Sequence, residues 1–176
     1  VPALIGLADG DTPGSDGNVY EADLPGGTNP ASPGTTLTDS FYIISPTFGV
    51  GAITVTADGV ATELSAAQLQ ALTPAMPAIF STASGTLSVL GYDTASGEVR
   101  YAYTLTNAGA ADSDSFVITL TDTVGNITLP RTLTVAIVDD GPQAAADTGS
   151  AFESGVVPGS GASGNVVTGS DLLGAD

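Results

Sequence analysis

The sequence predicts an all-β fold, an antiparallel β-sandwich with one short helix. Runs rich in Thr, Val, Ile and Tyr recur along the chain, and several alternate apolar and polar residues, as strands do. Clusters of Gly, Pro, Asp and Ser separate these runs, which is typical of sandwiches with tight turns. Strand and helix patterns do not alternate, so a parallel sheet is not indicated. A chain of 176 residues is long enough to bury an ordinary core.

Seven segments carry the strand pattern. The alternation is cleanest in 99–105 and in 116–120, where every second residue is apolar. A tight hairpin loop is predicted at 92–97, with Gly97 supplying the positive φ that such a loop requires. In chain order, the predicted strands are 18–24, 37–45, 52–57, 85–92, 97–106, 115–121 and 126–138.

One helix is predicted between the third and fourth of these strands. Ser65 and Gln68 stand in a capping-box pattern, in which each side chain satisfies a backbone N–H of the other residue. Leu64 and Leu69 flank this turn and can form a hydrophobic staple across it. Pro74 cannot continue a helix, so we expect the helix to end before it.

A change in composition and a weak internal similarity divide the chain into three parts. The acidic stretch 7–11 resembles 137–140, and an offset of about 130 residues suggests a tandem array of repeats. We therefore expect 1–18 to be a linker or the end of a preceding repeat, and 19–142 to be one β-sandwich module. The Gly/Ser-rich stretch 143–176 is expected to be the head of the next repeat or an exchangeable strand segment. The alternative is a chance recurrence of Asp, Gly and Pro.

The charge of the chain is strongly one-sided. There are 19 Asp and Glu residues against two basic ones, Arg100 and Arg131, which gives a formal net charge of −17. Binding to a phosphate backbone or to an anionic membrane surface requires Lys and Arg, so both are excluded. No apolar run approaches the roughly 20 residues of a membrane span. We therefore expect no nucleic-acid partner and no direct membrane insertion.

The missing residue types exclude most enzymatic machinery. The chain contains no His, Lys or Cys. Without His there is no Ser-His-Asp triad and no usual catalytic zinc site, and without Lys there is no Schiff-base or P-loop chemistry. The stretch 159–164 matches GxGxxG, but it opens no helix and belongs to no βαβ unit, so it does not indicate a dinucleotide site. The chain is predicted not to be an enzyme.

The acidic residues gather at the ends of the apolar runs, next to Gly, Ser and Pro. Carboxylates placed in this way repel one another unless a cation neutralises them, and Ca²⁺ prefers such oxygen ligands. The alternatives are a solvated acidic linker and a surface charged for solubility. The candidate metal ligands are Asp9, Asp11, Glu21, Asp112, Asp114, Asp122, Asp139 and Asp140.

These candidates cannot all belong to one site. In a sandwich, the loop before a strand and the turn after it lie at opposite ends, which places Asp112 and Asp114 at one pole and Asp122 at the other. The pair Asp139–Asp140 ends the last predicted strand and is the best candidate for a site between modules. The run 9–16 superficially suggests an EF-hand, but its spacing is wrong and no helices flank it.

Several stretches carry a family resemblance when they are taken in order: 64–72, 85–93, 97–105, 114–122 and 137–142. Together they resemble the tandem Ig-like or cadherin-like β-sandwich repeats of large bacterial RTX adhesins that are exported by type I secretion. The resemblance implies an extracellular extender module at the bacterial cell surface, rigidified by Ca²⁺, that supports cell adhesion and biofilm formation. It also implies interdomain Ca²⁺ at the junction acids Asp139 and Asp140. Members carry a further Asp where this chain has Asn126, which weakens a site near Asp122.

Two other functions stay open. The chain could be a self-assembling surface-fibre subunit whose tail, 143–176, adds a strand to a neighbouring sandwich. It could also be a tip domain that binds a glycan or peptide, with Ca²⁺ bridging the ligand. For the extender, the expected partners are neighbouring repeats of the same chain or identical subunits, and other domains would bind any cell-surface or glycan ligand.

Overall fold

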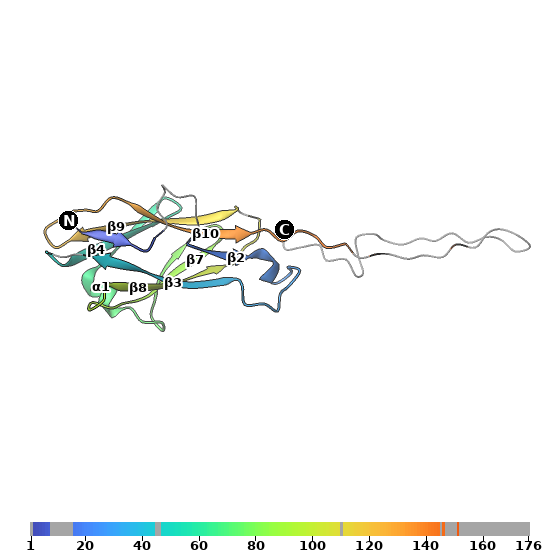
Figure 1. Ribbon diagram of the computed structural model, residues 1–176, viewed down its shortest axis with the longest axis horizontal. Coiled ribbons are helices and arrows are strands. Elements are labelled where there is room, and N and C mark those ends of the chain that lie inside the picture. The colour runs from blue at the N-terminus through green and yellow to red at the C-terminus, as the bar shows by residue number, and fades with distance from the viewer. Residues whose placement is uncertain are drawn as a thin grey trace, which may run out of the picture.

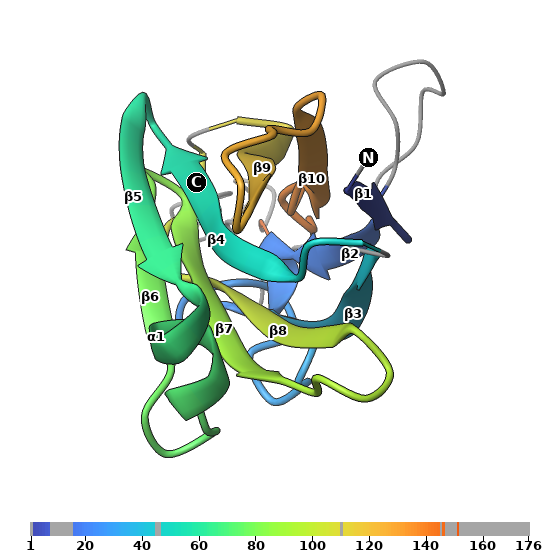
Figure 2. The same cartoon turned by 90° about the vertical axis from the view of Figure 1, so that its left-hand side faces the viewer.

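Two β-sheets pack face to face in a sandwich (Figure 1). The computed structural model describes residues 2–7, 16–44, 47–109, 111–144, 146 and 151. Within these residues each sheet has five strands, ordered β1-β3-β8-β7-β6 in the first and β2-β10-β9-β4-β5 in the second. In Figure 2, β5 and β6 lie along one side of the sandwich and β1 lies on the other. The predicted all-β sandwich is confirmed.

The strands follow one another with few long connections. In chain order they are β1 (Ala3–Ile5), β2 (Gly17–Tyr20), β3 (Thr36–Ile44), β4 (Val50–Ala57), β5 (Val60–Ser65), β6 (Ala78–Ser81), β7 (Gly85–Tyr92), β8 (Glu98–Leu105), β9 (Ser113–Asp122) and β10 (Arg131–Val138). A short 3₁₀ helix, η1 (Glu21–Asp23), follows β2, and the helix α1 (Ala66–Ala71) lies between β5 and β6. The helix therefore carries the chain from the second sheet back to the first.

The strand order is that of an immunoglobulin-type sandwich. β3, β8 and β7 take the places of strands B, E and D, and β10, β9, β4 and β5 take those of G, F, C and C′. β1 pairs antiparallel with β3, whereas β2 pairs parallel with β10 in the other sheet. This parallel pair departs from the predicted antiparallel arrangement. It arises because the chain changes sheets between β1 and β2, and it brings the ends of β2 and β10 together.

Two predicted strand boundaries were wrong, for reasons that lie in local hydrogen bonds. The segment 18–24 leaves the sheet after Tyr20, because the Leu24 N–H bonds to the Glu21 carbonyl and closes η1. The segment 126–138 becomes a strand only at Arg131. Its first residue, Asn126, belongs instead to a turn held by Asp122.

Three observed strands, β1, β5 and β6, were not predicted. β5 follows a tight hairpin turn in which Asp58 and Gly59 both have positive φ, 45° and 78°. β1 lies within 1–18, the stretch expected to be a linker or the end of a preceding repeat, and it is hydrogen-bonded into the first sheet. The stretch 143–176 lies almost entirely outside the described residues. The two predictions for it, the head of the next repeat and an exchangeable strand segment, therefore stay predictions.

The helix forms where its capping signal predicts. The Gln68 N–H donates to Ser65 Oγ at 3.3 Å, and the Ser65 N–H donates to Gln68 Oε1 at 2.9 Å, which completes the capping box. Leu64 and Leu69 on either side of this turn are both buried in the core. In the described part of the chain, no helix is long and apolar enough to cross a membrane.

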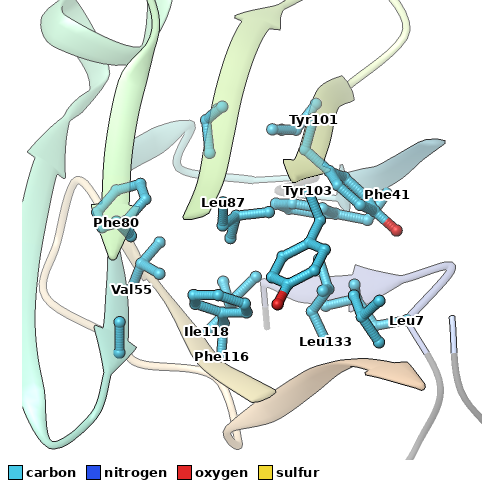
Figure 3. Close-up of a cluster of buried hydrophobic side chains, with 14 of the residues drawn as sticks. Leu7, Phe41, Val55, Phe80, Leu87, Tyr101, Tyr103, Phe116, Ile118 and Leu133 are labelled. Carbon is cyan, nitrogen blue, oxygen red and sulfur yellow. The ribbon is translucent and has the colours of Figure 1, made fainter. Parts of the chain in front are cut away.

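The core lies between the sheets and is filled by the inward side chains of both (Figure 3). Phe41, Tyr101 and Tyr103 come from the first sheet, and Phe116 comes from the second together with aliphatic residues. The rings of Tyr103 and Phe116 meet edge to face across the sheets, with centroids 6.0 Å apart. Burial raises the pKa of Tyr101, with a further contribution from the nearby charges of Asp39 and Asp16.

The chain enters the sandwich at one pole and leaves it at the other (Figure 1). Ala3 pairs with Ile44 at the end of β3, so β1 begins at what we call the near pole. β10 runs the opposite way from β9 and ends beside Tyr20 at what we call the exit pole. The exit pole therefore gathers the ends of β2 and β10, the start of β9, and the loops next to them.

Candidate functional site

Three of the predicted ligands, Glu21, Asp112 and Asp139, line one hollow of about 410 Å³ at the exit pole. Glu21 opens η1 directly after β2, Asp112 precedes β9, and Asp139 follows β10. They meet because β2 and β10 are parallel and end together, while antiparallel β9 begins beside them. Ala108, Gly109, Ala111 and Ile137 complete the lining. We call this feature the acidic hollow.

Glu21 is the most deeply placed carboxylate of the hollow, with 3% of its surface exposed. Its Oε1 accepts a hydrogen bond of 2.6 Å from the backbone N–H of Gly109. Such charge-assisted bonds are stronger than neutral ones. Glu21 therefore fastens the loop between β8 and β9 to the end of β2, and this contact forms one wall of the hollow.

The junction pair divides between two roles. Asp140 is buried, and its two carboxylate oxygens accept hydrogen bonds from Thr28, at 2.8 Å from the backbone N–H and at 2.5 Å from the hydroxyl. It ties the loop after η1 to the end of the last strand. Asp139, one residue earlier, is exposed and faces the acidic hollow. Of the pair, Asp139 is therefore the residue whose side chain lines the open hollow.

Sequence reasoning missed a further buried acid in the same region, Asp23. Its Oδ1 accepts a bond of 3.0 Å from the Asn29 side chain. A Cβ at position 34 would stand 2.0 Å from its Oδ2, so any other residue there would displace this carboxylate from its observed position. A possible sequence signal was the run of turn residues that follows Asp23, since such loops need acceptors for their N–H groups.

Asp114 also lies at the exit pole, but it points inward and does not line the acidic hollow. One carboxylate oxygen accepts hydrogen bonds from Tyr103 Oη at 2.8 Å and from the Thr82 hydroxyl. The other accepts a bond from the Ser115 N–H. Burial raises the pKa of Tyr103, and its hydrogen bond to Asp114 raises it further. Asp114 therefore links the two sheets, which is a structural task.

Asp122 lies at the near pole, so the predicted separation from Asp112 and Asp114 is confirmed. Its oxygens accept bonds from the Val124 N–H, from the Asn126 N–H and from the Asn126 side chain, at 3.0, 2.8 and 2.7 Å. Burial opposes the charge of this carboxylate, but the bonds from Asn126 and from the turn N–H groups hold its pKa below the usual value. Asn126 acts here as a donor that an Asp could not replace.

The carboxylate oxygens of the predicted ligands are the right kind of ligand for Ca²⁺, which takes 6–8 oxygens. Within the described ranges, however, no three acidic side chains stand close enough together to hold one ion. Asp9 and Asp11, the two remaining candidates, lie outside the described residues. The described acids therefore do not form a complete Ca²⁺ site by themselves, and the metal assignment stays a prediction.

No family model and no curated protein matches this chain. Two solved structures are similar in fold. One is the SrpA adhesin from Streptococcus sanguinis, with a TM-score of 0.41, 16% identity, and coverage of 77% of this chain and 56% of that one.

The second is the sialic acid binding region of a Streptococcus sanguinis SK1 adhesin, bound to 3'sLn. Its TM-score is 0.40 and its identity 14%, with coverage of 81% of this chain and 32% of the other. This chain thus spans about half of one structure and a third of the other. At TM-scores this low, neither similarity decides what this chain binds.

Proposed function

We propose that this chain is an extracellular structural module of a bacterial surface adhesin, a spacer rather than an enzyme. The observation that carries the proposal is the course of the chain, which enters at the near pole and leaves at the exit pole. Modules connected in this way line up end to end. β9 has 10 residues, which at about 3.3 Å per residue gives each module a length of roughly 33 Å along the strands.

The roles of the acids support a structural module. Asp114 joins the two sheets, Asp140 holds a loop, and Asp122 closes a turn, so these carboxylates serve the fold. The chain has no His, Lys or Cys with which to build common catalytic centres. Its resemblance to adhesin repeats gives the surface location, the adhesion and biofilm role, and the export by type I secretion as parts of the same proposal.

We further propose that Ca²⁺ stiffens the exit pole. Asp139 and at most one of Glu21 and Asp112 would bind the ion directly, and the remaining oxygen ligands would come from backbone groups, water or groups outside the described residues. Without the ion, the carboxylates repel one another across the hollow, which loosens the loops that meet there. A bound Ca²⁺ would neutralise the carboxylate charges and so remove this repulsion. Since binding to the folded state alone stabilises it, the effect would be visible as a change in stability.

The test is a Ca²⁺ titration of protein first treated with a chelator, followed by thermal melting and small-angle scattering. Ca²⁺ is expected to raise the Tm and to narrow the distribution of shapes. Asp139→Asn should lose most of the rise in Tm. Glu63→Gln is the matched control, since it removes one exposed charge from β5, away from the hollow, and should retain the rise. If neither Tm nor scattering responds to Ca²⁺, the metal part of the proposal is wrong.

A further inference from the structure

The longest uncharged stretch of this acidic chain runs from Leu64 to Tyr92, where no Asp, Glu, Lys or Arg occurs. In a chain with a net charge of −17, so long a gap is a distinctive feature. The stretch folds into α1, β6 and β7 and the loops that join them. These elements, with β5, lie along one side of the sandwich, opposite β1 (Figure 2).

This side of the molecule also exposes large apolar side chains. Ile79, in the middle of β6, is 62% exposed, and Met76, just before that strand, is 72% exposed. Large apolar residues at the edge of a sheet are a recognised site of association. Glu63 and Asp93 bound the stretch in the sequence, and Asp58, at the tip of the β4–β5 hairpin in the other sheet, accepts a hydrogen bond of 3.0 Å from the Ala83 N–H just beyond β6.

β6 is the outermost strand of its sheet, and within the described residues it pairs only with β7. Its other edge therefore offers backbone N–H and C=O groups to an added strand. Sheets often protect such an edge with Lys, with an inward charge or with Pro in the strand. None of the four residues of β6, Ala78–Ser81, is charged or Pro. The features that do protect β6 are its short length of four residues and Pro77 directly before it.

The charge pattern identifies the partner. A partner of opposite charge would gain by contacting the acidic poles, and it would not need an uncharged surface. An uncharged contact surface is needed when the partner is itself strongly acidic, because charges farther away than the Debye length of about 8 Å are largely screened. A second copy of this chain is such a partner, with the same charge and the same open edge.

We propose that two copies of this chain associate side by side through β6, with the two β6 strands antiparallel about a twofold axis. This geometry joins the first sheets of both copies and lets Ile79 of each copy cover apolar surface of the other. It leaves both poles open, so modules in line could also associate laterally with a neighbouring chain. The inference goes beyond the proposed spacer function and does not depend on Ca²⁺.

Sedimentation equilibrium of the full chain in chelator, over a wide range of concentration, tests the proposal. The chain is expected to form a dimer that strengthens with added NaCl, because salt screens the remaining repulsion. Ile79→Glu should weaken the association about tenfold or more. Leu129→Glu is the control, since it makes the same charge change at a side chain that is 80% exposed at the near pole, and it should leave the dimer intact.

A monomer at every concentration would overturn the proposal, and so would a dimer that Ile79→Glu leaves unchanged, which would point to another surface such as the tail. Association that requires Ca²⁺ would also overturn it, and would support the metal at the poles instead. Since the chain has no Cys, Ile79→Cys and Leu129→Cys give a second measurement. Mild oxidation should give a covalent dimer faster with Ile79→Cys, and equal rates would contradict β6 pairing.

Discussion

Asp114 shows how a carboxylate that resembles a metal ligand in the sequence serves the core instead. Its position before an apolar run suggested a loop ligand, yet it lies in β9 on the same face as Phe116, Ile118 and Leu120. The period-two pattern already places these residues on one face, so the inward direction of Asp114 was readable from the sequence. The sequence could not show that two hydroxyl groups, of Tyr103 in β8 and of Thr82 just after β6, donate hydrogen bonds to Asp114 from the side of the first sheet.

Replacing Asp114 should therefore destabilise the protein without any effect of metal. Asp114→Ala leaves the buried Tyr103 hydroxyl without its acceptor and should lower the free energy of unfolding by about 2 kcal/mol. Asp114→Asn keeps an acceptor and should cost less. Urea unfolding in chelator measures both. Asp112→Ala, at an exposed neighbour, should change stability by no more than about 0.5 kcal/mol. Equal losses at the two positions would contradict this role for Asp114.

At the scale of elements, local signals predicted most of the strands and the helix. Alternation located β3, β4, β7, β8, β9 and β10, and the capping box located α1. β5 was missed although Asp58-Gly59, a typical hairpin signal, precedes it, because its exposed residues do not alternate. β6 was missed because it is only four residues long and follows Pro74 and Pro77 closely, so it has no strand pattern of its own. These two edge strands are defined by pairing with a neighbour, which a local pattern does not record.

The hairpin between β4 and β5 provides a direct measure of turn strain. Gly59 has φ of 78°, and a Cβ at this position would meet no atom within 4 Å. Gly59→Ala should therefore lower the free energy of unfolding by about 1–2 kcal/mol through backbone strain alone. Gly141→Ala is the matched control, because its Cβ also meets nothing but its φ is not positive. A thermal melt in which both variants match the parent would show that this turn relaxes at no cost.

At the scale of the whole molecule, the sequence predicted the separation of acids between two poles but not the acidic hollow. The hollow requires β2 to run parallel to β10, and that pairing joins residues more than a hundred positions apart. A sequence pattern read locally cannot reveal which distant strands end together. Glu21 therefore lies beside Asp112 and Asp139 because of the strand order, not because of any local sequence pattern. The parts that were predicted depend on local periodicity, and the parts that were missed depend on strand order.

The net charge of −17 should make the stability of the whole molecule depend on salt. At pH 7 the carboxylates repel one another, so NaCl should stabilise the fold by screening, in chelator as well as in Ca²⁺. A gain of about 1 kcal/mol corresponds to a rise in Tm of about 2–4 °C for a chain of this size. Near the sequence pI of about 4.1 the net charge is small, and the rise should nearly vanish.

The measurement near pH 4 also depends on Asp122. Its pKa is below the usual carboxyl value, so the stability that it contributes is present above about pH 4 and is lost only as the pH falls through the lowered pKa. The turn it closes should therefore persist near the pI, where the repulsion has gone. Calorimetry against NaCl at both pH values measures the effect. A Tm that is flat in salt at pH 7, or that rises equally near pH 4, would show that repulsion among the acids does not limit stability.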